Sequence, residues 1–160
     1  MMKSAAARED KGEEKAVFAA YLAQHRLKRS EQREVILDTF LRAGRHVSVE
    51  DLLHIAQRRR PDIGRTTVYR TLKLLREAGL ARELALEGET RFEADWKRAH
   101  HDHFICNSCG AIIEFSSPEI ERTQEEIASR LGFRIEGHRH HIFGLCSRCA
   151  SRPPRDPTRR

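Results

Sequence analysis

Apolar residues recur three or four positions apart along the first half of the chain, the spacing that places them on one face of a helix. Residue types that commonly begin or end helices divide this half into four such segments. We expect helices over 13–25, from Ser30 to Gly44, from Ser48 toward Arg60, and from Thr66 to near Gly79. Residues 1–12, before the first helix, are expected to be a disordered lead-in.

The fourth of these helices has two contrasting faces. At 100° per residue, one face carries Val68, Thr71, Leu72 and Leu75. The opposite face carries Thr66, Tyr69, Arg70, Lys73 and Glu77. Two strand-like runs around Gly88 follow and predict a hairpin. Three or four short helices and a hairpin are typical of a winged helix, in which the fourth helix would read the major groove of DNA.

The polar face of that helix suits contact with DNA. Tyr69 can stack on sugars or touch a thymine methyl group, while Arg70 and Lys73 can reach base edges or phosphates. Lys28 and Arg29 precede the second helix and could enter a neighbouring minor groove. A face that is simply solvated would carry the same residue types, so that interpretation stays open beside the first.

The second half of the chain has a mixed pattern. Extended strands are expected around 100–103, over 112–115 and over 133–143. Between the last two, Ser116 and Glu119 fit a capping box that would begin a helix ending at Gly132. Its buried stripe would be Ile120, Ile127 and Leu131.

Four cysteines form two C-x-x-C pairs with 36 residues between the pairs. Each pair supplies two thiolates from one tight turn, and two pairs complete a tetrahedral zinc site. The alternatives are two disulfides or a redox-active pair. We expect structural zinc, bound by Cys106, Cys109, Cys146 and Cys149.

A histidine-rich segment, 100–103, lies directly before the first pair. In an extended strand, side chains alternate, so His101 and His103 would point one way and His100 and Asp102 the other. Each pair could therefore begin a separate site. Imidazole and carboxylate ligands without thiolates suit Fe(II), Mn(II), Co(II) or Zn(II). An ordinary surface or core role is preferred for His25 and His54.

Composition narrows the classes of protein further. The 160 residues carry a net charge of +6, and no apolar run approaches the roughly 20 residues of a membrane span. The first fifteen residues lack the apolar core of a signal peptide. These observations predict a cytoplasmic protein of one large domain or two small ones. A zinc hydrolase is disfavoured, because the chain has no HExxH or nucleophile motif.

Several strings together resemble the ferric uptake regulator (Fur) family. They cover about residues 25–149: HVSVEDL at 46–52, TTVYRTL at 66–72, RFE at 91–93, HHDHFICNSCG at 100–110, IIEFSSPEIE at 112–121 and GHRHHIFGLCSRC at 137–149. The histidine cluster followed directly by C-x-x-C is the most specific of them. His140 and His141 match no family role, and the tail at 151–160 has no counterpart.

The resemblance implies an α+β fold with a winged-helix DNA-binding domain and a small α/β dimerisation domain that holds the four-cysteine zinc site. The domains would span 13–94 and 100–150, joined by a hinge at 95–99 and followed by a disordered basic tail at 151–160. The regulatory metal ligands would be His46, Glu93, His101, His103 and Glu114. An additional metal site would use His100, Asp102, Glu121 and His138.

The resemblance also implies a function. The chain would be a homodimeric repressor, not an enzyme, that binds an A/T-rich inverted repeat in double-stranded DNA when its regulatory metal is bound. The DNA contacts would include Lys28, Tyr69 and Arg70. Fe²⁺ is expected as the regulatory ion, with Mn²⁺ or Zn²⁺ as alternatives and Zn²⁺ as the structural ion. A zinc-uptake regulator, a peroxide sensor, and a metal-storage or metal-delivery protein are the competing functions.

Overall fold

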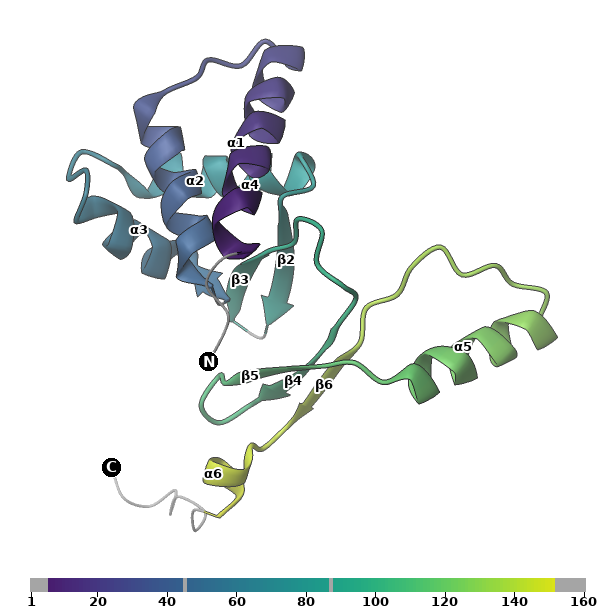
Figure 1. Ribbon diagram of the computed structural model, residues 1–160. Helices are drawn as coiled ribbons and strands as arrows, with labels where there is room; N and C mark the ends of the chain where they lie inside the picture. The colour runs from purple at the N-terminus through teal and green to yellow at the C-terminus, as the bar shows by residue number, and fades with distance from the viewer. Residues whose placement is uncertain (1–5, 45, 87, 152–160) are drawn as a thin grey trace. The chain divides into compact units, whose positions relative to one another are not determined.

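The structure is a computed structural model that describes residues 6–44, 46–86 and 88–151. The chain divides between Arg98 and Ala99 into a first unit and a second unit, and each is described by itself (Figure 1). The elements of the first unit are α1 (Ala6–Gln24), α2 (Glu31–Ala43), β1 (Val47–Ser48), α3 (Val49–Gln57), α4 (Arg65–Glu77), β2 (Ala81–Leu86) and β3 (Glu89–Ala94). None of the described helices is long and apolar enough to span a membrane.

The helix caps of the first unit follow the sequence. At the start of α2, the Ser30 side chain accepts a hydrogen bond from a backbone N–H. Gly44 ends that helix with a φ of 60°, a left-handed conformation that glycine adopts at little cost. Ser48 and Asp51 form the predicted capping box at the start of α3. Helix α3 ends at Gln57, before the Arg60 that the sequence suggests.

Helix α1 begins earlier than the sequence predicts. It starts at Ala6, so residues 6–12 are helical and the prediction of a disordered lead-in is wrong for them. Residues 1–5 lie outside the described residues. Alanine and charged residues with high helix propensity extend the helix beyond its apolar part. Phe18 and Leu22 anchor α1 in the core, with exposed fractions of only 3% and 2%.

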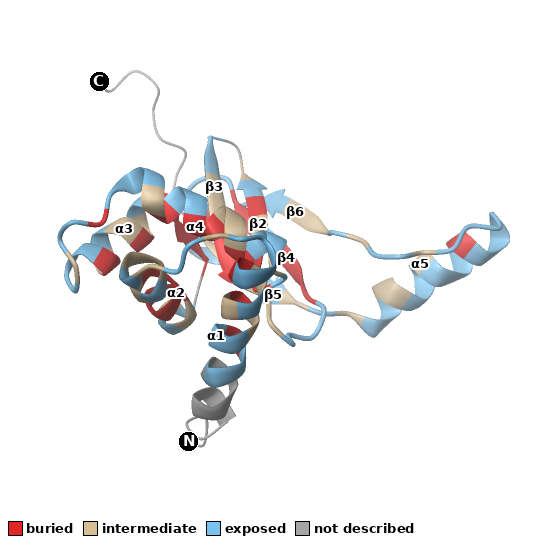
Figure 2. Cartoon of the chain, turned by 90° about the horizontal axis from the view of Figure 1, so that it is seen from above, coloured by how far each residue is buried: buried red, intermediate tan, exposed pale blue. Residues whose placement is uncertain are grey.

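Helix α4 has the two faces predicted for it. Val68, Leu72 and Leu75 are fully buried in the core of the first unit, whereas Tyr69 and Arg70 are exposed. Figure 2 shows the same division along α4 and the other helices of this unit. The buried face packs against α2 and α3.

A three-stranded sheet of order β1-β3-β2 completes the first unit. Strands β2 and β3 form the predicted hairpin, and Gly88 in its turn has a φ of 77°. Strand β1 pairs antiparallel with β3, with Val47 opposite Phe92. This helix-and-hairpin arrangement is the winged helix expected from the sequence.

The second unit is built on another three-stranded sheet, of order β5-β4-β6. Strand β4 pairs antiparallel with β5 and parallel with β6. In the chain, β5 and α5 lie between β4 and its parallel neighbour β6. They supply the long connection that two parallel strands need. The elements are β4 (Asp102–Cys106), β5 (Ile112–Phe115), α5 (Pro118–Arg130), β6 (His141–Gly144) and α6 (Ser147–Ala150).

Three details of the second unit differ from the predictions. The predicted strand over 133–143 is regular only over His141–Gly144, because its partner β4 has just five residues to pair with. Helix α5 is capped by Ser117 instead of Ser116, since Pro118 occupies its first turn. The predicted buried stripe is largely exposed in the single chain, where Leu131 retains 76% of its accessible surface. The tail over 152–160 lies outside the described residues.

Candidate metal centres and nucleic-acid interface

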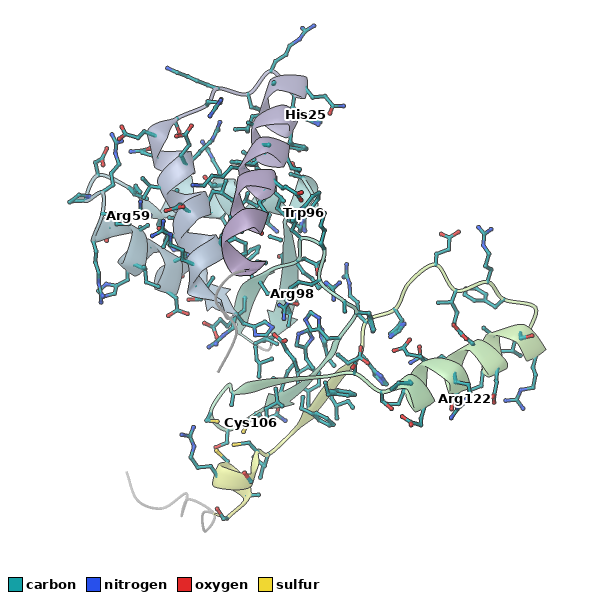
Figure 3. All side chains as sticks on the ribbon, in the orientation of Figure 1. His25, Arg59, Trp96, Arg98, Cys106 and Arg122 are labelled. Atoms are coloured by element: carbon teal, nitrogen blue, oxygen red, sulfur yellow. The ribbon has the colours of Figure 1, made fainter. Side chains whose placement is uncertain are left out.

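The four cysteine thiols converge at one end of the second unit. Cys106 is the last residue of β4, and Cys109 follows it three residues later. Cys146 is the N-cap of α6, and Cys149 lies within that helix. Their sulfur atoms all lie within 4.8 Å of one another, and none is in a disulfide. In Figure 3 the yellow sulfur atoms gather near Cys106, beside α6.

The spacing of these thiols fits a zinc ion. Sulfur atoms bound tetrahedrally to zinc at about 2.3 Å lie about 3.8 Å apart. The Sγ atoms of Cys109 and Cys146 are 3.8 Å apart, whereas a disulfide would bring them to about 2 Å. The four-cysteine cluster could therefore bind zinc and tie the start of the second unit to its end.

Local hydrogen bonds prepare part of this cluster for metal binding. The backbone N–H of Cys146 donates to Sγ of Cys106 at 3.3 Å and lowers the pKa of that thiol to about 6. The backbone N–H of Ala111, assisted by the Arg148 guanidinium, lowers the pKa of Cys109. The thiolate is the form that binds zinc, so these bonds favour the ligating state.

Within the first unit, strand register brings His46 beside Glu93. Because Val47 lies opposite Phe92, the residue that precedes β1 meets the residue that follows Phe92 in β3. Nε2 of His46 is 3.1 Å from Oε2 of Glu93. Arg98 donates to the same carboxylate oxygen at 3.1 Å. This unit therefore holds two of the predicted regulatory ligands in one place.

Within the second unit, the sheet aligns the other predicted regulatory ligands. His103 lies in the central strand, opposite Glu114 of β5 and His141 of β6. Cross-strand neighbours share a face of the sheet, so the three side chains can act together. The rings of His101 and His103 are 4.9 Å apart, as expected from the alternation of side chains along the strand.

The predicted additional site is assembled entirely within the second unit. One oxygen of Asp102 lies 3.2 Å from His100 Nε2 and 3.7 Å from His138 Nε2. Glu121 from α5 lies 3.5 Å from His100 and 3.3 Å from His138. The ligand atoms of all four residues lie within 4.8 Å of one another.

Unsatisfied buried atoms test whether a cation fits there. Oδ2 of Asp102, Oε1 of Glu121 and Nε2 of His138 are buried and make no hydrogen bond among the described residues, although Oε1 of Glu121 and Nε2 of His138 are close enough for an ion pair. Such atoms are costly in a folded protein unless something binds them. A divalent cation would satisfy several at once, so the donor set fits a nitrogen- and oxygen-bound metal.

The predicted DNA-contacting residues all lie in the first unit, but they differ in exposure and in their contacts with other side chains. Thr66, Arg70 and Lys28 are exposed, and Tyr69 keeps 44% of its accessible surface. Lys73 is held instead by Glu83 of β2, with Nζ 2.8 Å from a carboxylate oxygen. Its ammonium also lies 5.4 Å from the centre of the Tyr69 ring. The polar face of α4 is thus partly neutralised by the hairpin.

The structure adds residues that the sequence did not assign to a site. His141 lies beside His103, with ring centres 5.6 Å apart. His140 lies near Asp102, with its Nδ1 3.9 Å from Oδ2 of that carboxylate. Both histidines are visible in the sequence, but their positions depend on how β6 pairs with β4. Glu83 could not be chosen among the acidic residues without the packing of the hairpin on α4.

Comparisons with known proteins agree with this arrangement. The model of the ferric uptake regulator family matches residues 24–143. The ferric uptake regulation protein of Campylobacter upsaliensis is 40% identical over 134 residues, which cover 82% of this chain and 86% of that protein.

Solved structures give the same result. The ferric uptake regulator of Helicobacter pylori, described as having three functional metal binding sites, superposes with a TM-score of 0.83 at 29% identity. The superposition covers 89% of this chain and 95% of that one. A zinc-bound manganese uptake regulator superposes with a TM-score of 0.63 at 35% identity, covering 81% of this chain and 97% of that one.

Proposed function

The chain belongs to the ferric uptake regulator family, and from this we propose that it is an iron-dependent repressor of metal-uptake genes. Members of the family are metal-responsive transcription regulators, not enzymes, that bind DNA and act as dimers. We propose that the regulatory metal fixes the angle between the DNA-binding and dimerisation domains, over 13–94 and 100–150, through a hinge at 95–99. Such a regulator would act in the cytoplasm, where its operator DNA lies.

The regulatory site would combine ligands from both units. The first unit would supply His46 and Glu93, and the second would supply His101, His103 and Glu114. The observation that carries this proposal is that each unit already groups its own share, with His46 3.1 Å from Glu93 and the rings of His101 and His103 4.9 Å apart. An ion that binds both groups favours one relative arrangement of the units over all others.

The DNA-binding surface would be the polar face of α4 with the hairpin as a wing. Thr66, Tyr69, Arg70 and Lys73 would contact the major groove, and Lys28 would reach an adjacent minor groove. A dimer reads two half-sites related by two-fold symmetry, so the partner would be an A/T-rich inverted repeat. Metal binding would set the separation of the two α4 helices to the half-site spacing.

A fluorescence-anisotropy titration tests this function. The protein would carry zinc in its four-cysteine site, be stripped of other metals, and receive Fe(II), Mn(II) or Zn(II) without oxygen. We expect operator affinity to rise about 100-fold with Fe(II), which corresponds to about 2.7 kcal/mol of coupling. The double substitution His101→Ala and His103→Ala should abolish this gain, whereas His54→Ala should retain it. A metal response that survives the double substitution would contradict the ligand assignment.

The four-cysteine site would hold structural Zn²⁺. Cys106→Ser should unfold the second unit, because binding of structural zinc contributes directly to folding. The first unit should keep its fold, which the fluorescence of the single tryptophan, Trp96, reports. If metal analysis finds almost no zinc in the Cys106→Ser variant while amide hydrogen exchange shows an intact second unit, a structural role for zinc is ruled out.

The same titration separates the remaining candidates. A zinc- or manganese-responsive regulator of the family would reach full operator binding at a lower free concentration of that ion than of Fe(II). A peroxide sensor would lose operator binding after peroxide treatment of the Fe(II) form. A metal-storage or metal-delivery protein would bind metal but show no sequence-selective DNA binding.

A further inference from the structure

One residue beside the additional site has no role so far. His140 lies in the segment that leads into β6, two residues after His138. Its carbonyl oxygen accepts a hydrogen bond from the backbone N–H of His103 at 3.1 Å. This bond fixes the backbone of His140 against β4, next to the cluster of His100, Asp102, Glu121 and His138.

The two consecutive histidines of this segment diverge. The His141 ring lies beside His103. Nδ1 of His140 instead lies 3.9 Å from Oδ2 of Asp102. Asp102 and His103 diverge in the same way because side chains alternate along an extended strand. His140 therefore lies next to Asp102 of the additional site, while His141 lies next to His103.

Buried polar atoms connect His140 with this site. Nδ1 of His140 and Oδ2 of Asp102 are both buried and lack a hydrogen-bond partner among the described residues. The side chain of Asp102 is only 1% exposed, so water does not readily supply the missing hydrogen bond. Oε1 of Glu121 and Nε2 of His138 also make no hydrogen bond among the described residues, although they lie 3.3 Å from each other. His140 and Asp102 thus present two buried polar atoms to each other at the edge of the cluster, and buried polar atoms without a hydrogen bond are suited to binding a metal ion.

The distance between Nδ1 of His140 and Oδ2 of Asp102 agrees with this interpretation. At 3.9 Å the two atoms are too far apart for a hydrogen bond. Two ligand atoms that each lie about 2.1 Å from one ion are separated by about 3 to 4 Å. This separation is compatible with one ion bound by both atoms.

We propose that His140 is a fifth ligand of the additional site and binds a divalent transition-metal ion through Nδ1. This inference rests on the proposed metal site of His100, Asp102, Glu121 and His138. The fifth ligand changes the donor set from two nitrogens and two carboxylates to three nitrogens and two carboxylates. More imidazole favours Zn(II), Co(II) and Ni(II) over Mg(II) and Mn(II). His140 thus makes the site tighter and more selective.

Cobalt(II) is the probe that tests coordination number. The parent protein would be the full chain with zinc in the four-cysteine site and the substitutions His101→Ala and His103→Ala, so that added Co(II) reports on the additional site. Ligand-field absorption of Co(II) weakens as its coordination number rises from four to five. Against this parent, His140→Ala should strengthen the visible bands and weaken Co(II) binding about tenfold or more. The preference for Co(II) over Mn(II) should also shrink.

Two further variants make the result unambiguous. His54→Ala removes an exposed imidazole of the first unit and should leave the cobalt spectrum unchanged. Asp102→Ala should abolish binding at the site. If the parent binds no Co(II) beyond the zinc site, the additional site itself is refuted, and His140 with it. If the parent binds one Co(II) and His140→Ala changes neither the spectrum nor the affinity, only the role of His140 is overturned.

Discussion

At the scale of single residues, Asp38 shows how one buried carboxylate joins several elements. It lies in α2 and receives Lys15 of α1 at 3.0 Å, Arg42 of its own helix at 3.2 Å and Arg59 at 2.7 Å. Burial opposes its ionisation, but the hydrogen bonds from Lys15 and Arg59 outweigh burial and hold the pKa of Asp38 below its usual value. The carboxylate is therefore more stable in the folded state than in the unfolded chain.

Asp38→Asn should destabilise the first unit by about 1–2 kcal/mol at pH 7, because it removes the charge but keeps the shape. A lowered folded-state pKa gives stability that is present above the unfolded pKa, about 3.9, and is lost as the pH falls through the folded value. The difference between the two proteins should therefore shrink below about pH 4. Urea denaturation followed by Trp96 fluorescence measures it.

The exposed Asp62 provides a control for this prediction. Its side chain is 56% exposed and pairs with Arg60, so Asp62→Asn should change stability much less than Asp38→Asn, because exposed ion pairs are screened by water. Equal effects of the two substitutions, or a difference for Asp38→Asn that persists unchanged at pH 3, would argue against a stabilising role for this carboxylate.

At the scale of elements, the contact between α4 and the hairpin neutralises part of the positive charge on the proposed DNA-binding face. Glu83 of β2 accepts hydrogen bonds from Lys73 at 2.8 Å and from Arg76 at 2.7 Å. Both cations belong to α4, so a single carboxylate neutralises part of the helix and also fixes the hairpin against it. Burial opposes the ionisation of Glu83, but the two cations outweigh burial and lower its pKa.

Glu83→Gln should release two cations for contact with phosphates. Each additional phosphate contact steepens the plot of log affinity against log salt by about 0.9. We therefore expect a slope that is steeper by about one to two for a duplex without an operator, and a smaller preference for operator DNA. Anisotropy titrations over a series of salt concentrations measure both quantities.

Glu77→Gln, at the end of α4 itself, is a matched control for Glu83→Gln in β2. It changes the net charge equally, but the carboxylate of Glu77 accepts a hydrogen bond from the Tyr21 hydroxyl at 2.8 Å. Its loss should leave the salt slope nearly unchanged. The neutralising role of Glu83 is refuted if both variants alter the slope by the same amount.

At the scale of the whole molecule, the second unit exposes apolar surface that its own elements leave uncovered. Phe104 of β4 and Ile113 of β5 lie opposite each other in the sheet and are 43% and 54% exposed. Leu131 and Phe133 after α5 are 76% and 70% exposed. Large apolar side chains exposed on a folded unit are typical of an interface between proteins. Since the family acts as dimers, we propose that a second copy of the chain covers this surface.

Phe104→Glu should therefore weaken dimerisation at least about 100-fold, because it would bury a carboxylate in an apolar interface. Sedimentation velocity should show monomers at concentrations where the unmodified chain is dimeric. Tyr69→Glu is the control, since Tyr69 is 44% exposed but lies in the first unit. If Phe104→Glu dimerises as tightly as the unmodified chain, the interface lies elsewhere.

Features that depend on nearby residues were predictable from the sequence. They include the caps at Ser30 and Ser48, the two faces of α4 and the hairpin at Gly88. Each depends on residues a few positions apart, whose hydrogen bonds and periodicity are set by the adjacent chain. Errors occurred where a neighbouring element or residue decided the outcome, as in the short β6 and the exposed stripe of α5.

The sequence by itself determined the family, the winged helix and the residue types available for metal binding. Only the tertiary structure decided which of them meet. The pairing of β1 with β3 places His46 beside Glu93, and the pairing of β6 with β4 sends His140 toward Asp102 and His141 toward His103. These partners are separated by dozens of residues, so strand register and the packing of distant elements bring them together, and local sequence preferences do not encode either.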